Sequence, residues 1–239
     1  MTKHSSSILA VIPARGGSKR IPRKNLVNFY DSPIISYPIK AAIKTGCFDE
    51  IMVSTDDQEI ASVAKSFGAS VPFPRSIGAS NDTATTLDVL LEVLSEYEKL
   101  NKHFTHLCCL YPTSVFVTAG MIKQGYKMLQ EADTNGVATF VPYDQPIERA
   151  FCEENGHVFL RSPEHSLTRT QDLPVSYFDA GQMYFLNVST VLAEKKVFVS
   201  QLRPIFLNPN HVQDIDYPED LALAKLKYGF LQGQSSHDN

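Results

Sequence analysis

Short apolar runs alternate with amphipathic segments along the first 141 residues of the chain. The apolar runs predict buried strands, and segments whose apolar residues recur every three or four positions predict helices. Continuous Ile, Leu and Val runs are typical of parallel strands that are covered on both faces. The pattern therefore predicts an α/β, Rossmann-like fold, with a mostly parallel sheet and helices on both of its faces. The expected strands are residues 8–13, 51–54, 107–110 and 137–141, and the expected helices are residues 33–45, 57–67, 87–100 and 119–131.

Polar residues and glycines mark the expected helix ends. Asp56 is a good N-cap for the second helix, and Gly68 follows its last residue. A final helix is expected at residues 221–231. Asp216 would cap this helix, with Glu219 completing a capping box.

The alternation of strands and helices stops after residue 141. The next stretch, up to about Tyr177, is irregular and is interrupted by Pro146, Gly156, Pro163 and Pro174. A loop of this length within a compact domain is uncommon unless it packs against something. We therefore expect one domain over residues 1–239, with residues 142–180, which we call the arm, protruding from it.

Composition and charge exclude several classes of protein. The 239 residues are 43% hydrophobic and carry a formal net charge of −4, which permits a sizeable core and argues against a general nucleic-acid binder. No apolar segment is long enough to cross a bilayer, and the four cysteines form no CxxC pair that would indicate zinc or a disulfide framework. We expect a soluble cytoplasmic protein with neither a nucleic-acid nor a membrane partner.

The first expected strand ends in a loop that is rich in glycine and positive charge. We call residues 14–25 the basic loop. Gly16 and Gly17 allow its backbone to approach a ligand and to direct N–H groups at it. The polar side chains favour a polyanion, most simply a nucleoside triphosphate, at the carboxyl edge of the sheet. A solvated basic turn or a phosphate-steering surface for nucleic acid is the alternative, because the GxxxxGK[ST] order is absent. The side chains concerned are Arg15, Ser18, Lys19, Arg23, Lys24 and Asn25.

Two carboxylates near the C-terminal end of the chain suggest a metal site. Asp214 and Asp216 lie two residues apart in a segment expected to be extended, so their side chains project to the same side. Paired carboxylates together with phosphate oxygens are ligands that Mg²⁺ accepts. The helix cap proposed for Asp216 is the simpler alternative, and one residue can serve both purposes.

The basic loop resembles the signature of the CMP-sugar synthetases, in its segments Ala14-Arg15-Gly16-Gly17-Ser18-Lys19 and Ile21-Pro22-Arg23-Lys24-Asn25. These enzymes are the cytidylyltransferases that activate sialic acids and related nonulosonic acids, and the resemblance spans roughly the whole chain. It implies transfer of CMP from CTP to a nine-carbon sugar acid, with Mg²⁺ as cofactor and pyrophosphate as product. The catalytic residues would be Arg15, Lys24, Asp214 and Asp216, and nucleotide contacts would come from Ala14, Arg15, Gly16, Gly17, Ser18, Lys19 and Asn25.

The resemblance also implies where the base binds. In the family, a segment like residues 79–86 lies against the cytosine and the ribose. Arg75 and Ala84 fall where contacts to the base are expected. The residues alone support a simpler alternative, in which this polar segment caps the helix that follows it.

The sugar acid is expected to contact residues from the second half of the chain. Tyr111 stands where the family often has Gln, which places the contact usually made from that position in doubt. The segments Arg169-Thr170-Gln171-Asp172-Leu173-Pro174 and Asp179-Ala180-Gly181-Gln182 resemble the pseudaminic-acid branch more than the sialic branch. Arg169 could clamp a carboxylate, although pairing with Asp172 or Asp179 is the alternative. Polar groups of the sugar would be recognised by Gln171, Gln182 and Tyr184.

In the family, the region that corresponds to the arm is exchanged between two subunits, so a homodimer is implied. Two other functions remain open from the residues. One is an α/β sugar transferase that consumes a nucleotide sugar, and the other is a nucleotide-binding regulator without catalysis. The intact Asp214/Asp216 pair argues against the regulator. The basic loop favours synthesis, because a triphosphate needs more donors than a diphosphate sugar does.

Overall fold

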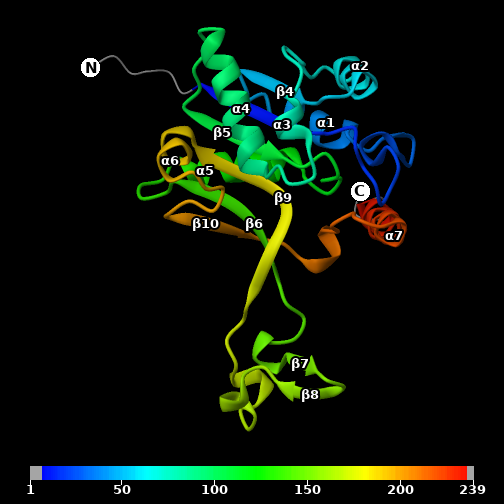
Figure 1. Ribbon diagram of the computed structural model, residues 1–239, viewed down its shortest axis with the longest axis vertical. Helices are drawn as coiled ribbons and strands as arrows, with labels where there is room; N and C mark the ends of the chain where they lie inside the picture. Colours follow the sequence, from blue (N-terminus) through cyan, green and yellow to red (C-terminus); the bar gives the residue numbers. More distant parts are fainter. Residues whose placement is uncertain (1–6, 236–239) are drawn as a thin grey trace.

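Six strands form one mixed sheet in the structure, a computed structural model that describes residues 7–235 (Figure 1). Their order across the sheet is β10-β6-β9-β5-β1-β4. The neighbouring pairs are parallel except those of β9, which runs antiparallel to β5 and to β6. The α/β class and the mostly parallel sheet are thus confirmed. The strands are β1 (Ile8–Pro13), β4 (Glu50–Ser54), β5 (His106–Leu110), β6 (Gly136–Pro142), β9 (Tyr177–Asn187) and β10 (Leu202–Phe206).

Helices cover both faces of the sheet, as the sequence predicts. One face packs against α1 (Ser36–Thr45), α2 (Gln58–Ser66) and α5 (Ala119–Leu129). The other face packs against α4 (Thr86–Lys99) and α6 (Val188–Glu194), with the short α3 (Ile77–Ser80) leading into α4. Successive side chains of a strand point to opposite faces, so each buried strand contributes to both layers of the core.

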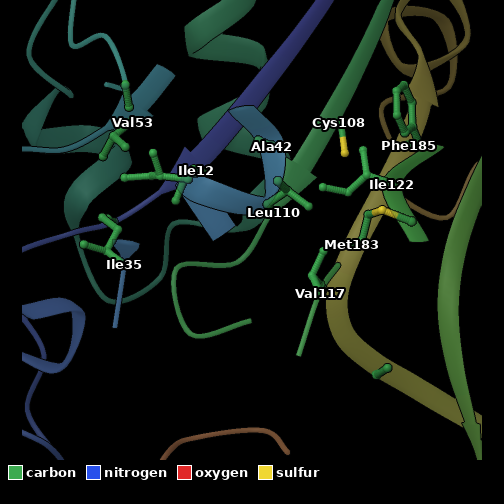
Figure 2. Packing of buried hydrophobic residues seen from close by; sticks show 14 of the residues in the cluster. Ile12, Ile35, Ala42, Val53, Cys108, Leu110, Val117, Ile122, Met183 and Phe185 are labelled. Atoms are coloured by element: carbon green, nitrogen blue, oxygen red, sulfur yellow. The ribbon is translucent and has the colours of Figure 1, made fainter. Parts of the chain in front are cut away.

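The layer under α1 and α5 is drawn in Figure 2, where Ile12 of β1 and Leu110 of β5 lie among helix side chains such as Ala42 and Ile122. Met183 and Phe185 continue this layer across β9. All six side chains are fully buried. Apolar burial of this kind is the main source of stability for the sheet that carries the site.

Two segments of the second half were not predicted as elements. The stretch from Tyr177 is strand β9, and residues 188–206 form α6 and β10. β9 enters the sheet between β5 and β6, and its bulge between the pairs of Ala138 and Phe140 interrupts the ladder. Because β9 is buried on both faces only in its second half, its apolar run is too short to stand out from the polar segment before it.

A third cluster of apolar residues fastens the C-terminal helix α7 (Pro218–Ser235) to the start of the chain. The short hairpin β2 (Asn28–Phe29) and β3 (Ser32–Pro33) contributes Phe29, which packs with Ala224 of α7. Ile21 of the basic loop and Ile215 belong to the same cluster. This packing brings residues that are far apart in the sequence to one edge of the molecule.

Two predicted helix caps are wrong by one residue. Asp57, not Asp56, caps α2, because its carboxylate accepts hydrogen bonds from the backbone N–H groups of Glu59 and Ile60 at 2.9 Å. At α7, Asp220 rather than Glu219 reaches back, accepting from the N–H groups of Asp216 and Tyr217 at 3.0 and 2.8 Å. Because Asp57 and Asp220 make these capping bonds, Asp56 and the carboxylate of Asp216 are available for other contacts.

The arm leaves the sheet where β6 ends and returns where β9 begins, and Figure 1 shows it projecting away from the sheet and its helices. It carries the hairpin of β7 (Phe151–Glu154) and β8 (His157–Leu160) and several single helical turns. Its apolar side chains are widely exposed, with Phe151 at 65% and Leu167 at 96%. Within residues 7–235, no helix combines the length and the hydropathy needed to cross a bilayer.

Candidate active site

The basic loop follows β1 directly and is held against the N-terminus of α2. Ala14 is fully buried, and its N–H continues the ladder to the carbonyl of Ser54 at 2.9 Å. Gly16 donates its N–H to a carboxylate oxygen of Asp56 at 2.8 Å, so this group is not free to bind a phosphate as predicted. A Cβ on Gly16 would lie 2.9 Å from the Asp57 carboxylate, whereas one on Gly17 would meet open space. Gly16 is therefore required for close packing, and Gly17 remains open to a ligand.

Two of the predicted phosphate-binding cations contact Asp82. A guanidinium nitrogen of Arg15 lies 3.0 Å from one carboxylate oxygen of Asp82, and the Lys19 ammonium donates to the other oxygen. Arg23, also predicted to face a ligand, instead pairs with Asp57 and Glu59. Arg23 therefore fastens the basic loop to α2 and is not available as a phosphate donor.

The other end of the basic loop meets the C-terminal aspartates. Nζ of Lys24 lies 3.1 Å from Oδ1 of Asp216 and donates to the carbonyl of Ile215 at 2.6 Å. The guanidinium of Arg20 lies 2.8 Å from the same carboxylate oxygen. A cavity of about 150 Å³ lies between them; its lining includes Arg15, Ser18, Lys19, Asn25 and Asp216. Lys24 and Asp216, which are 192 positions apart in the chain, thus share one cleft at the carboxyl edge of β1.

The side chains of Asp214 and Asp216 flank Ile215, which is completely buried. Asp214 is exposed at the surface, but partial desolvation and the negative charge of Asp216 raise its pKa, against the opposing effect of Lys24. A carboxylate whose pKa is raised by the charge of a second carboxylate favours a cation close to the pair. Within residues 7–235, no cluster of three or more metal-ligating side chains was found. Mg²⁺ commonly takes one or two carboxylates and completes its shell with substrate phosphates and water.

Asn25 has a different orientation from the one that phosphate binding would need. Its amide nitrogen donates to the carbonyl of Arg15 at 2.9 Å, and its oxygen is buried without a partner. The carbonyl of Arg15 can only accept, so the amide cannot be reversed. Asn25 therefore ties the two ends of the basic loop together, and its side-chain oxygen is left as a buried acceptor without a partner.

The residues predicted to contact the base lie beside the basic loop. Arg75 is 8% exposed, and its Nε donates to the carbonyl of Ala79 at 2.8 Å; burial lowers its pKa despite the attraction of Asp56. The N–H of Ala84 donates to the side chain of Asn81 at 2.8 Å. The helix-cap alternative is also realised, because Thr85 and Asp88 form a capping box at α4. These contacts shape the segment next to Arg15.

Three of the predicted sugar-contacting residues lie together, one just after the end of β5 and two in the interior of β9. The phenol oxygen of Tyr111 lies 2.7 Å from Oγ1 of Thr86, and the rings of Tyr111 and Tyr184 lie 5.6 Å apart. Tyr184 donates its hydroxyl to Asp179, and burial raises the pKa of Tyr184. Gln182 is 2% exposed and has a buried side-chain oxygen without a partner. The other two predicted sugar-contacting residues, Arg169 and Gln171, lie on the arm and not in this group. Arg169 lies 2.8 Å from Asp172.

Comparison with known proteins decides the family. A profile described as cytidylyltransferase matches residues 9–233. The chain belongs to the cytidylyltransferase family. It is 38% identical over 221 residues to a pseudaminic acid cytidylyltransferase of Campylobacter jejuni, covering 92% of this chain and 95% of that protein. It is 34% identical to the CMP-N,N'-diacetyllegionaminic acid synthase of Legionella pneumophila, covering 91% and 94%. A solved CMP-2-keto-3-deoxy-manno-octonic acid synthetase with CTP shares the fold, with a TM-score of 0.69, 17% identity, and coverage of 95% of this chain and 100% of that one.

The structure of this cytidylyltransferase adds site residues that its sequence did not single out. Arg20 and Asp82 both contact predicted site residues, and Asp179 bonds to Tyr184. A second cavity, of about 560 Å³, opens beside Asp214 at the base of the arm and is also lined by Asp179 and Lys227. In the sequence, Arg20, Asp82 and Asp179 were indicated only by their positions close to predicted site residues. A larger hollow of about 1010 Å³ between α1, α5 and α7 contains none of the predicted site residues.

Proposed function

We propose that this cytidylyltransferase transfers CMP from CTP to pseudaminic acid and releases pyrophosphate. The observation that carries the proposal is the cleft in which the basic loop and Asp216 meet. This cleft joins the basic loop to Asp216, one of the two carboxylates that we propose for Mg²⁺, and Asp214 lines the second cavity. Nucleotidyl transfer from a triphosphate requires a polyanion site and a metal site of this kind. Two relatives named after pseudaminic acid match this chain at 38% identity, and the legionaminic acid synthase matches it at 34%.

In this reaction the anomeric hydroxyl of the sugar attacks the α-phosphorus, in line with the departing pyrophosphate. Catalysis of this kind depends on positioning and charge neutralisation. Arg15, Lys19 and Lys24 bind the phosphates, and Asn25 fixes the shape of the loop that carries them. Asp214 and Asp216 would hold Mg²⁺, which would supply positive charge to polarise the α-phosphate and to lower the pKa of the attacking hydroxyl. The cytoplasm, where CTP is made, is the compartment that we propose for this reaction.

The sugar acid lies between the Asp214 side of the cleft and the Tyr111–Gln182–Tyr184 group. The carboxylate of the sugar acid needs a cation as its partner. The arm and the base of the arm offer few cationic side chains for this. Lys227, beside Asp214, already donates to the carbonyls of Pro209 and Val212 and to Gln213 at 2.9–3.1 Å. We assign the missing cation to Arg169 of the partner subunit, in a homodimer whose arms are exchanged. The exposed apolar side chains of the arm support this assembly, because a second chain would cover them.

Release of pyrophosphate from CTP tests the proposed function. The purified protein is mixed with CTP, Mg²⁺ and each of three acids: pseudaminic, legionaminic and N-acetylneuraminic acid. Pseudaminic acid should give the highest kcat/KM, and omission of Mg²⁺ should abolish turnover. A higher kcat/KM with either of the other acids would reassign the substrate. Turnover of a CMP-sugar with a glycan acceptor, and none of CTP, would support a sugar transferase instead.

A further inference from the structure

The carboxylate of Asp82 contacts both of the basic-loop cations nearest to β1. A guanidinium nitrogen of Arg15 lies 3.0 Å from its Oδ1, and Nζ of Lys19 donates to its Oδ2. The same nitrogen of Arg15 donates to the backbone carbonyl of Asn81 at 3.1 Å. The segment between α3 and α4 is therefore fastened to the basic loop by three contacts, all of them to the groups proposed to bind phosphate.

Asp82 presents the same chemistry to these cations as a phosphate group would. In each case two anionic oxygens on one central atom accept from a guanidinium and an ammonium group. The three side chains stay open to solvent, with Arg15 36% exposed, Asp82 54% and Lys19 77%. Ion pairs this exposed are weak, so a triphosphate, with its greater charge, would displace Asp82 from them.

The segment around Asp82 keeps its shape through other contacts. The side-chain oxygen of Asn81 accepts from the N–H and hydroxyl groups of Thr83 and from the N–H of Ala84, at 2.8–2.9 Å. Arg75 holds the carbonyl of Ala79 in the preceding turn. None of these bonds uses the Asp82 carboxylate. A substitution at residue 82 therefore removes the contact to the cations and leaves the segment's own hydrogen bonds in place.

We propose that Asp82 competes with phosphate for Arg15 and Lys19, and returns to them as pyrophosphate leaves. The inference rests on the proposed role of the basic loop in binding the triphosphate. The loop carries five cationic side chains, and pyrophosphate bears several negative charges, so the product would otherwise dissociate slowly. The Asp82 carboxylate competes for the same cations and so shortens the time for which pyrophosphate remains bound. Asp82 lowers the affinity for CTP and for pyrophosphate, and it makes no bond to the reacting atoms.

The variant D82N tests the proposal, because it keeps the size of the side chain and removes its charge. Calorimetry should show that D82N binds pyrophosphate about three- to tenfold more tightly than the unaltered protein, the range expected for losing one or two exposed pairs. Pyrophosphate should also inhibit the reaction at a concentration lower by the same factor. The control E96Q changes the net charge equally on the outer side of α4, where Glu96 pairs with Lys99, and should leave the pyrophosphate Kd unchanged.

Unchanged or weaker pyrophosphate binding by D82N would overturn the proposal. D82S repeats the measurement if D82N unfolds at a lower temperature than E96Q. R15A separates this result from a failure of the proposed function. If R15A leaves the binding of pyrophosphate and CTP unchanged, the basic loop is not the phosphate site and both proposals fall. If R15A weakens binding while D82N does not strengthen it, only the competition by Asp82 is excluded.

Discussion

The carboxylate of Asp216 lies between two cations of the basic loop, 2.8 Å from Arg20 and 3.1 Å from Lys24. In the proposed reaction it exchanges part of this pairing for Mg²⁺. We expect D216N to lower kcat about 100-fold or more, since loss of one preorganised charge in a site of this kind costs about 3 kcal/mol. Pyrophosphate release at saturating CTP and sugar acid measures the effect.

A matched change at the same helix start provides the control for D216N. Glu219 is exposed and lies in the first turn of α7, so E219Q removes the same charge without touching the cleft. E219Q should retain kcat within about twofold, as expected of an exposed surface substitution. Mg²⁺-dependent turnover by D216N at the level of E219Q would exclude Asp216 as a metal ligand.

Asn25 offers a test that separates the shape of the basic loop from its charge. The residue is 4% exposed, and its amide nitrogen faces the carbonyl of Arg15. N25D places a carboxylate oxygen against that carbonyl. We expect the KM for CTP to rise at least tenfold and the free energy of unfolding to fall by about 1–3 kcal/mol, as for a lost buried hydrogen bond. Steady-state kinetics and urea unfolding measure the two effects, and an unchanged KM would show that the tie is unimportant for binding.

At the scale of elements, the sequence correctly predicted those strands and helices that depend on the local pattern of apolar and polar residues. Strands β1, β4, β5 and β6 and helices α1, α2, α4 and α5 follow from apolar runs and periodicity, whereas the short α3 was not predicted. The antiparallel β9 was missed, because its direction depends on which strands it joins. The exact caps were missed too, since Asp56 and Asp57 are equally good caps in isolation. Contact with Gly16 decides between them, and it forms only in the folded chain.

The cap of α2 leads to a prediction about pH. The pKa of Asp57 is lowered on folding, because hydrogen bonds from α2 and from Arg23 outweigh the opposing effect of burial. The stabilisation is therefore complete above the unfolded value, near 3.9, and is lost as the pH falls through the lower folded value. D57N keeps a cap and should lose this pH dependence, whereas D57A should also lose about 0.5–2 kcal/mol at pH 7. Urea unfolding between pH 2.5 and 7 distinguishes them, and equal pH dependence in D57N would contradict the assignment.

Ile215 connects the third apolar cluster to the carboxylate pair. It is completely buried with Ile21 and Phe29, and its carbonyl accepts from Lys24. We expect I215A to cost about 2–5 kcal/mol and also to lower kcat, because the resulting cavity lets Asp214 and Asp216 shift. Ile205 on β10 is buried in a different cluster, so I205A should cost similar stability and retain kcat well below its Tm. Equal loss of kcat in both variants would assign the effect to stability alone.

At the scale of the whole molecule, the sequence predicted that residues 142–180 would leave the domain, and the structure shows the arm projecting. The sequence could not show what the tip of the arm contacts, because in the proposed homodimer that contact is made with a second chain. Within one chain, Arg169 pairs with Asp172, which is one of the two pairings that the sequence offered as an alternative. The assignment of Arg169 to the partner subunit's site therefore needs an experiment that distinguishes sites within one chain from sites shared by two.

Mixed dimers of D216N and R169A chains make this distinction. If Arg169 acts in the partner's site, a mixed dimer has one site with both substitutions and one intact site. Random pairing should then restore about one quarter of the unaltered activity at limiting sugar acid, because half of the dimers are mixed and hold one intact site of two. If each chain builds its own site, every site carries one substitution, and activity stays at the mean of the two variants. R203A, which alters an exposed pair with Glu131 on the domain, replaces R169A in the control and should keep the activity of its own sites.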